Sequence, residues 1–358
     1  MSEMERNHRI FMGVTVTVLA GLLVFAWCGH SRLYTVTVLP QVGGQMVVPC
    51  AINDRGQIVG VCQGLFYLWQ QGRDWRELGS AADTRDFYCI NNAGQIAGTM
   101  QDPNGSERAF LWDPNEGLTT LMLPGGHGSA VRGLNNRGKV VGGCWNAAGV
   151  GRAFLWSKAG GMEPMDESAW GAAAINDAGQ VVGWRKPAAQ EPKDGQFCLW
   201  EPTGDGTMLE TLLPSGALYG INNNGYVLGK TFNFDKKRHY VFLWRQDRHV
   251  EWLFPLESQA ARVVALNDAN QVAVCEEAHS GLLKRLTKRN ITPRKESFVW
   301  TRENGRISLD GYVLEEKGEY FNITAMSNRG CIVGTVTSKA GDIRRAVLLE
   351  PIPERWGR

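Results

Sequence analysis

The sequence predicts an all-β fold, a seven-bladed β-propeller, on three observations. A turn motif of the form apolar–Asn–Asp/Asn–x–Gly recurs in five full and two degraded copies, and an aromatic motif that ends in Trp follows it in six repeats. The tryptophans at 69, 112, 156, 200, 244 and 300 are 43, 44, 44, 44 and 56 residues apart. A period of ~40–45 residues that contains several short strands is typical of a propeller blade.

The turn motif predicts a hairpin loop between two apolar strands. Its last residue needs a positive φ, which glycine adopts without steric cost, and the copy that lacks glycine has the next most tolerant residue, Asn270. Asn and Asp side chains in such turns bond their own backbone. Asp54, Asp177 and Asp268 lack the alternating oxygen ligands of a calcium loop. The motif is therefore predicted to be structural, and no metal site is expected. The copies begin at Asn53, Asn91, Asn135, Asn176, Asn222, Asn267 and Ser327.

Each repeat is predicted to contain an inner strand, the Asn turn, a second strand, a variable loop, an aromatic third strand and an outer strand. Ala109-Phe110-Leu111-Trp112 is apolar on both faces, as expected for a strand between two blades. The tryptophans are therefore expected to pack between blades.

An additional strand at residues 33–39 precedes the first repeat, whereas the last repeat, ending at Pro351, lacks an outer strand. We expect the N-terminal strand to complete the seventh blade, which removes two exposed sheet edges. The propeller then spans residues 33–351, followed by a tail at 352–358.

Residues 10–28 form an uncharged run of nineteen residues, preceded by Arg6 and Arg9. This length is at the lower limit of a spanning helix, ~20 residues. It predicts one N-terminal hydrophobic helix that acts as a transmembrane signal anchor, with residues 1–9 in the cytoplasm and the propeller outside. The alternative is a cleaved signal peptide and secretion.

The repeated motifs resemble the HAF-repeat proteins, a bacterial family of exported, propeller-like repeat proteins. The histidine of the family name is absent here, since the matching positions read Arg108-Ala109-Phe110 and Arg152-Ala153-Phe154. No role of that histidine is carried over. The resemblance implies a β-propeller fold and an exported location, and it implies no established activity.

Composition excludes several functional classes. The chain has 38 basic and 36 acidic residues, which gives no electrostatic reason to expect nucleic acid. Its eight cysteines form no Cys-x-x-Cys pair, so they are expected to act as small apolar residues, with one or two cross-blade disulfides as the alternative. No nucleotide or hydrolase motif occurs, and no cofactor is expected.

The predicted ligand face carries the loops between second and third strands together with the connections between repeats, because long variable loops carry function. A basic insert at 278–296 on this face is either a contact for an acidic partner or a solvated loop. The candidate ligand-binding residues are His127, Arg132, Trp170, Tyr219 and Arg262.

The inner strands offer no recognisable acid/base set, so the sequence predicts a binding module, not an enzyme. The expected partner is a protein or a surface polymer outside the cytoplasmic membrane, and the propeller is expected to be monomeric. The alternatives are a structural protein of the envelope, or a hydrolase or lyase that acts on an exported polysaccharide.

Overall fold

Seven tight turns with the predicted motif organise the computed structural model. Their last residues have positive φ, for example +72° at Gly56, +91° at Gly179 and +59° at Asn270, where asparagine replaces glycine as predicted. The structure describes residues 33–80, 88–102, 104–123, 126–186, 196–202, 206–208, 216–278 and 294–353. The predicted hydrophobic segment 10–28 and most of the insert 278–296 lie outside these ranges.

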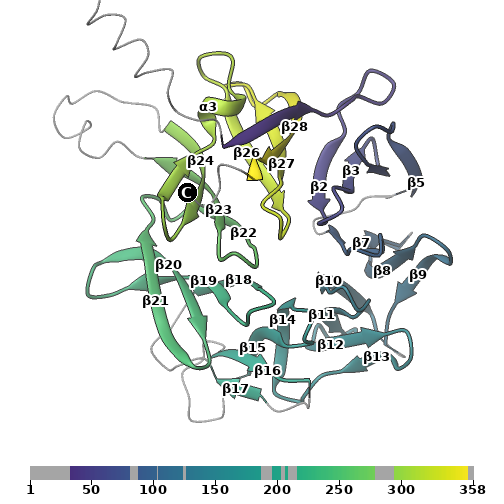
Figure 1. Ribbon diagram of the computed structural model, residues 1–358. Coiled ribbons are helices and arrows are strands. Elements are labelled where there is room, and N and C mark those ends of the chain that lie inside the picture. Colours follow the sequence, from purple (N-terminus) through teal and green to yellow (C-terminus); the bar gives the residue numbers. More distant parts are fainter. Residues whose placement is uncertain are drawn as a thin grey trace, which may run out of the picture. The chain divides into compact units, whose positions relative to one another are not determined.

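The chain divides into a large unit, Val36–Glu350, and a small unit made of its two ends. The large unit contains seven four-stranded antiparallel sheets placed around a common centre (Figure 1). In blades 1 to 3 the strands are β2 (Val48–Ile52), β3 (Ile58–Cys62), β4 (Leu65–Trp69) and β5 (Arg76–Ser80); β6 (Tyr88–Ile90), β7 (Ile96–Gln101), β8 (Glu107–Asp113) and β9 (Gly117–Leu121); β10 (Gly128–Leu134), β11 (Val140–Trp145), β12 (Gly151–Ser157) and β13 (Gly161–Pro164).

Blades 4 to 6 repeat the same order of inner, second, third and outer strand. Their strands are β14 (Ala169–Ile175), β15 (Val181–Arg185), β16 (Gln196–Trp200) and β17 (Gly206–Met208); β18 (Gly216–Ile221), β19 (Val227–Asn233), β20 (Arg238–Arg245) and β21 (Arg248–Pro255); β22 (Arg262–Leu266), β23 (Val272–Ala278), β24 (Arg294–Thr301) and β25 (Gly305–Ser308). These sheets confirm the predicted seven-bladed propeller.

The seventh blade draws its outer strand from the start of the chain, as predicted. Its order is β1-β28-β27-β26, with β1 at Tyr34–Val38, β26 at Tyr320–Met326, β27 at Ile332–Thr337 and β28 at Ile343–Pro351. The amide of Leu39, just after β1, donates to the carbonyl oxygen of Ala346 at 2.8 Å. Among the described residues the single helix is α3 (Asp310–Val313).

The hydrophobic core lies between blades. One cluster joins Val59 and Phe66 of blade 1 to Phe110 and Trp112 of blade 2. Further clusters repeat this pairing around the ring, and the cluster that joins blade 7 to blade 1 includes Leu348. The tryptophans that end the third strands therefore pack between blades, as predicted.

Candidate functional site

The turns between first and second strands converge on one end of the central channel, on a surface that we call the turn face. The first motif residue of each turn, asparagine in six copies and Ser327 in the seventh, is buried there. Asn91 accepts the backbone N–H groups of Ala93 and Gln95 at 3.0 Å through Oδ1. Its Nδ2 donates to Gln95 Oε1 at 2.7 Å and to the carbonyl of Asn135 in the next blade at 3.1 Å. The asparagine thus fixes its own turn and also links two blades.

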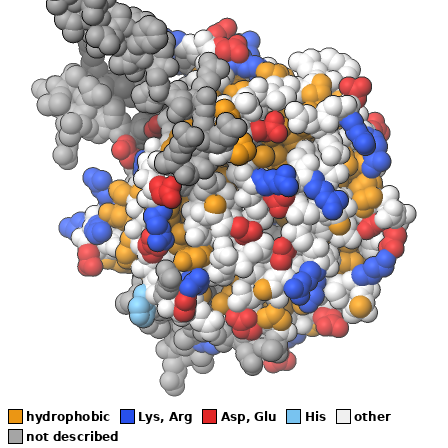
Figure 2. Space-filling view, viewed as in Figure 1, with side chains coloured by type: hydrophobic (Ala, Val, Ile, Leu, Met, Phe, Trp, Pro, Cys, Tyr) orange, Lys and Arg blue, Asp and Glu red, His pale blue; other side chains and the backbone are white. Residues whose placement is uncertain are grey.

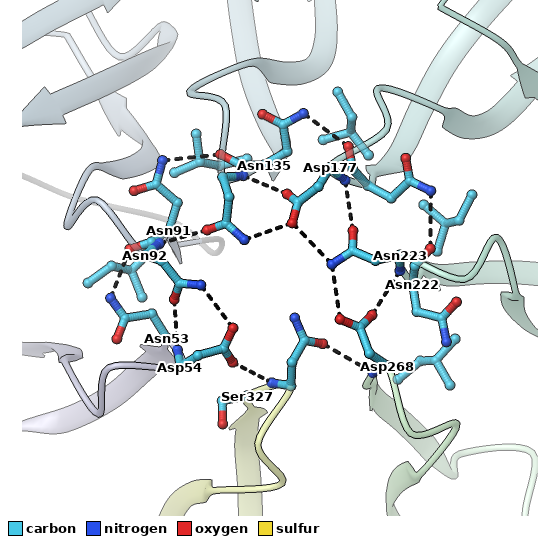
Figure 3. Close-up of a pocket in the computed structure, with 18 of the residues that line it drawn as sticks. Asn53, Asp54, Asn91, Asn92, Asn135, Asp177, Asn222, Asn223, Asp268 and Ser327 are labelled. Atoms are coloured by element: carbon cyan, nitrogen blue, oxygen red, sulfur yellow. Dashed lines mark hydrogen bonds between the residues drawn. The ribbon is translucent and has the colours of Figure 1, made fainter.

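The second residue of the motif builds a closed ring of hydrogen bonds across all seven blades (Figure 3). The backbone N–H of each residue donates to Oδ1 of the equivalent residue in the next blade, over distances of 2.8–3.2 Å. The ring runs Asp54, Asn92, Asn136, Asp177, Asn223, Asp268, Asn328 and back to Asp54. Sequence analysis missed this ring, although the Asn or Asp at the second position of the motif in every repeat is its signal.

The ring leaves little room at the turn face. The pocket inside it has a volume of about 160 Å³ and is lined by the turn residues and by one bulky apolar residue from each inner strand. Carboxylate oxygens in it accept side-chain amides, as when Asn223 Nδ2 donates to Asp177 at 3.1 Å and to Asp268 at 3.0 Å. These contacts support the predicted structural role of the motif.

The inner strands share a second feature that the sequence did not reveal, a β-bulge three residues before the turn. In each of six blades, the pairing between the inner strand and the second strand skips one residue of the inner strand at this position. A bulge re-aims the side chain of the extra residue. The skipped residues are Cys50, Arg132, Ala173, Tyr219, Val264 and Thr324. Two predicted site residues, Arg132 and Tyr219, are therefore bulge residues.

A larger cavity, of about 1120 Å³, lies at the other end of the channel. Residues near its rim include Gln45 and Met46, before β2, and Gln63, in the hairpin between β3 and β4. We call this surface the loop face, since it carries the hairpins between second and third strands. Ile52, Ile90 and Met326 line both this cavity and the turn-face pocket, so an apolar layer lies between them.

The five predicted site residues all lie on inner strands or at their loop-face ends, but they do not form one cluster. Arg262 lines the large cavity. Trp170 is 53% exposed at a second irregularity of β14, and Arg132 is also exposed. Tyr219 is half-buried, and burial raises the pKa of its phenol. His127 is exposed, and its backbone N–H donates to the carbonyl of Trp145 at 2.8 Å.

The hairpin between β19 and β20 presents an aromatic group on the loop face. The ring centroids of Phe232 and Phe234 are 5.1 Å apart, and those of Phe232 and His239 are 5.2 Å apart. Phe234 is 65% exposed. Burial, followed by the charge of Lys230, lowers the pKa of His239, so this imidazole is neutral at pH 7. The hairpin tip therefore offers an exposed aromatic surface.

Other surface features carry no single ligand class. Figure 2 shows acidic and basic side chains interspersed over the face in view. Within the described ranges, no group of three or more His, Cys, Asp or Glu side chains is placed to hold a metal ion. In that same part of the chain no helix is long and apolar enough to cross a bilayer. Seven cysteines there form no disulfide with one another: Cys50, Cys62, Cys89, Cys144, Cys198, Cys275 and Cys331.

Comparison with known proteins supports the fold. No protein-family model matches this chain, and the search of curated proteins finds no match. A streptogramin B lyase structure is similar with a TM-score of 0.55 at 11% identity, over 90% of this chain and 100% of that one. The β-propeller domain of the Trilobed protease from Pyrococcus furiosus is similar with a TM-score of 0.52 at 9% identity, over 89% and 96%. At such identities the likeness shows the propeller fold alone.

Proposed function

We propose that this propeller is a non-enzymatic binding module that recognises a protein or a surface polymer through its loop face. The main support is that four of the eight exposed large apolar side chains among the described residues lie on the loop face. Val150 and Phe234 lie in hairpins there, Trp170 lies near the start of β14 and Ile343 at the start of β28, and each is at least 40% exposed. Exposed apolar side chains that gather on one face are typical of interaction sites.

The composition of the channel supports binding over catalysis. None of the described residues that line the large cavity is Asp, Glu or His. A hydrolase or lyase needs at least two titratable groups that converge on the substrate. An enzyme on this fold would have to take those groups from surrounding loops, so catalysis is the alternative proposal.

The exported location is part of the proposal. Its support is the uncharged run at residues 10–28, whose length is at the lower limit of a spanning helix, ~20 residues. The HAF-repeat resemblance adds to this proposal.

Binding assays with paired surface variants test the function. Purified protein is measured against an array of bacterial glycans and envelope proteins, as wild type, as W170A/F234A, and as the turn-face control R55A/R137A. All four substituted side chains have exposed positions. We expect the loop-face variant to lose at least about tenfold in affinity for the selected partner, as for hot-spot aromatic residues, and the control to bind normally. Equal loss in the turn-face variant, or turnover of a glycan, would contradict the proposal.

A further inference from the structure

The large cavity has the dimensions of a small-molecule site. Small-molecule pockets in proteins are usually about 300–1,000 Å³, with apolar walls and few polar groups. This cavity measures about 1120 Å³ and is lined by parts of β2, β3, β6, β22 and β26. Its apolar walls include Met46, Val48, Val61, Val264 and Met326. Such walls suit an apolar ligand body.

Three cysteines add to this apolar wall. Cys50, Cys62 and Cys89 all line the cavity, and no disulfide joins them. Burial raises the pKa of Cys89 to about 11, although the backbone near Leu134 and the charge of Arg132 act in the opposite direction. The Cys89 thiol therefore contributes no negative charge at neutral pH.

Arg262 is the one charged residue among the described residues that line the cavity. Its Nη2 donates to Asn322 Oδ1 at 2.8 Å, to the carbonyl of Ile323 and, at 4.0 Å, to Cys275 Sγ. None of these acceptors is a carboxylate, and in the described part of the chain no ion pair includes Arg262. The guanidinium is thus held in position without a carboxylate partner among the described residues.

A fixed guanidinium beside apolar walls favours one ligand class. Guanidinium groups bind carboxylates, sulfonates and phosphates through charge-assisted hydrogen bonds, and with Nη2 engaged by Asn322 and Ile323 the donors for the acid group are Nη1 and Nε. Resting on the proposed binding function, we infer that the cavity binds a small amphipathic anion, with its acid group on Arg262 and its apolar body against the walls around Val264 and Met326. The shared chemistry is one acid group joined to an apolar body.

Two fluorescent probes of nearly equal shape test this inference on the full-length chain. Anilinonaphthalene sulfonate carries an acid group, and N-phenylnaphthylamine lacks it. We expect both to bind wild type, and R262Q to weaken the sulfonate probe by about tenfold or more while the neutral probe changes less than about twofold. R55Q on the turn face is the matched control, since it removes an equal charge outside the cavity. Any probe binding outside the cavity is the same in every variant.

A cavity-filling variant identifies where the probes bind. Val264 is a bulge residue that lines the cavity, so V264W is expected to exclude both probes, with its thermal unfolding measured to show that it is folded. If R262Q leaves both affinities unchanged, or lowers both equally, the anion inference is wrong while the cavity remains a site. If wild type binds neither probe, the inference also fails, and the loop-face proposal is then judged by the partner assays alone. R262K, which keeps the charge, is expected to bind the sulfonate between wild type and R262Q.

Discussion

At the scale of single residues, the first asparagine of the turn motif makes hydrogen bonds within its own turn and a further one to the next blade. Asn91 is 3% exposed and serves two backbone N–H groups, one side-chain oxygen and one carbonyl of the next blade. A buried polar group that loses its partner costs more free energy than the hydrogen bond itself contributes. This asparagine is therefore expected to be sensitive to truncation.

Asn91→Ala is predicted to lower the free energy of unfolding by about 2–4 kcal/mol, because it leaves two backbone donors and one carbonyl without partners. Urea denaturation measures the change. Asn104→Ala, at an exposed position in the hairpin between β7 and β8, is the control and should be nearly neutral. Equal stability of the two variants would contradict the role assigned to the motif.

Asn270 separates the backbone requirement of the turn from its side-chain contact. Its φ is +59°, and its Oδ1 accepts Asn222 Nδ2 at 2.8 Å. Alanine and glycine both remove that bond, but only alanine has a Cβ, which makes the left-handed backbone conformation less favourable by about 1–2 kcal/mol. N270A should therefore be less stable than N270G by about 1 kcal/mol in thermal denaturation. If N270A is as stable as N270G, this turn does not require a residue tolerant of positive φ.

At the scale of elements, the second strand of a blade passes very close to its neighbours at a glycine. A Cβ added at Gly142 of β11 would lie 1.9 Å from the carbonyl oxygen of Ala130 and 2.8 Å from the ring of Phe154. A Cβ at the adjacent Gly143 would meet nothing within 4 Å. β11 thus contains one glycine, Gly142, where a Cβ would clash, and a second, Gly143, where a Cβ has space.

G142A is predicted to destabilise the protein by about 2–4 kcal/mol, since β10 or β12 must move to admit a methyl group. G143A should be neutral or slightly stabilising, because alanine loses less entropy than glycine when a strand forms. Thermal denaturation of the two variants compares them directly. The reverse order would mean that the close contact between β10 and β11 is wrong.

The segment between α3 and β26 contains a pH-dependent contact. Burial alone would raise the pKa of Glu319, but the backbone N–H groups of Glu315 and Glu316 and the charge of Arg345 outweigh it, so the pKa is lowered. Arg345 Nη2 donates to Glu319 Oε2 at 3.0 Å. A carboxyl with a lowered native pKa stabilises the fold above its unfolded pKa of about 4.3, and this contribution is lost as pH falls through the native pKa.

E319Q is therefore predicted to be less stable than wild type at pH 7, and the two should converge as the pH is lowered below about 4. Urea denaturation across this pH range measures the difference. E316Q, at an exposed position, should follow wild type at every pH. If the difference in free energy of unfolding between E319Q and wild type stays constant down to the lowest pH, the Glu319 carboxylate is not the source of the pH dependence.

At the scale of the whole molecule, sequence periodicity predicted most of the fold. The tryptophan spacing, the seven turns and the spare strand at 33–39 correspond to seven blades with β1 beside β28. The cross-blade ring was missed, because its bonds join residues such as Asn92 and Asn136, 44 positions apart, and the motif alone does not show that they meet in the closed ring. The bulges at Arg132 and Tyr219, and the cavity beside Arg262, depend on the pairing register between strands. The sequence does not show that register.

The central claim is that the two ends of the channel differ, with the turn face closed by its own hydrogen bonds and the loop face available for ligand. Hydrogen–deuterium exchange, with and without the partner selected in the binding assays, tests it most directly. We predict slower exchange on binding in β22 (Arg262–Leu266) and in the β19–β20 hairpin, with no change in the turns around Asn53 and Asn135. Protection confined to those turns, with the loop-face strands unchanged, would contradict the account.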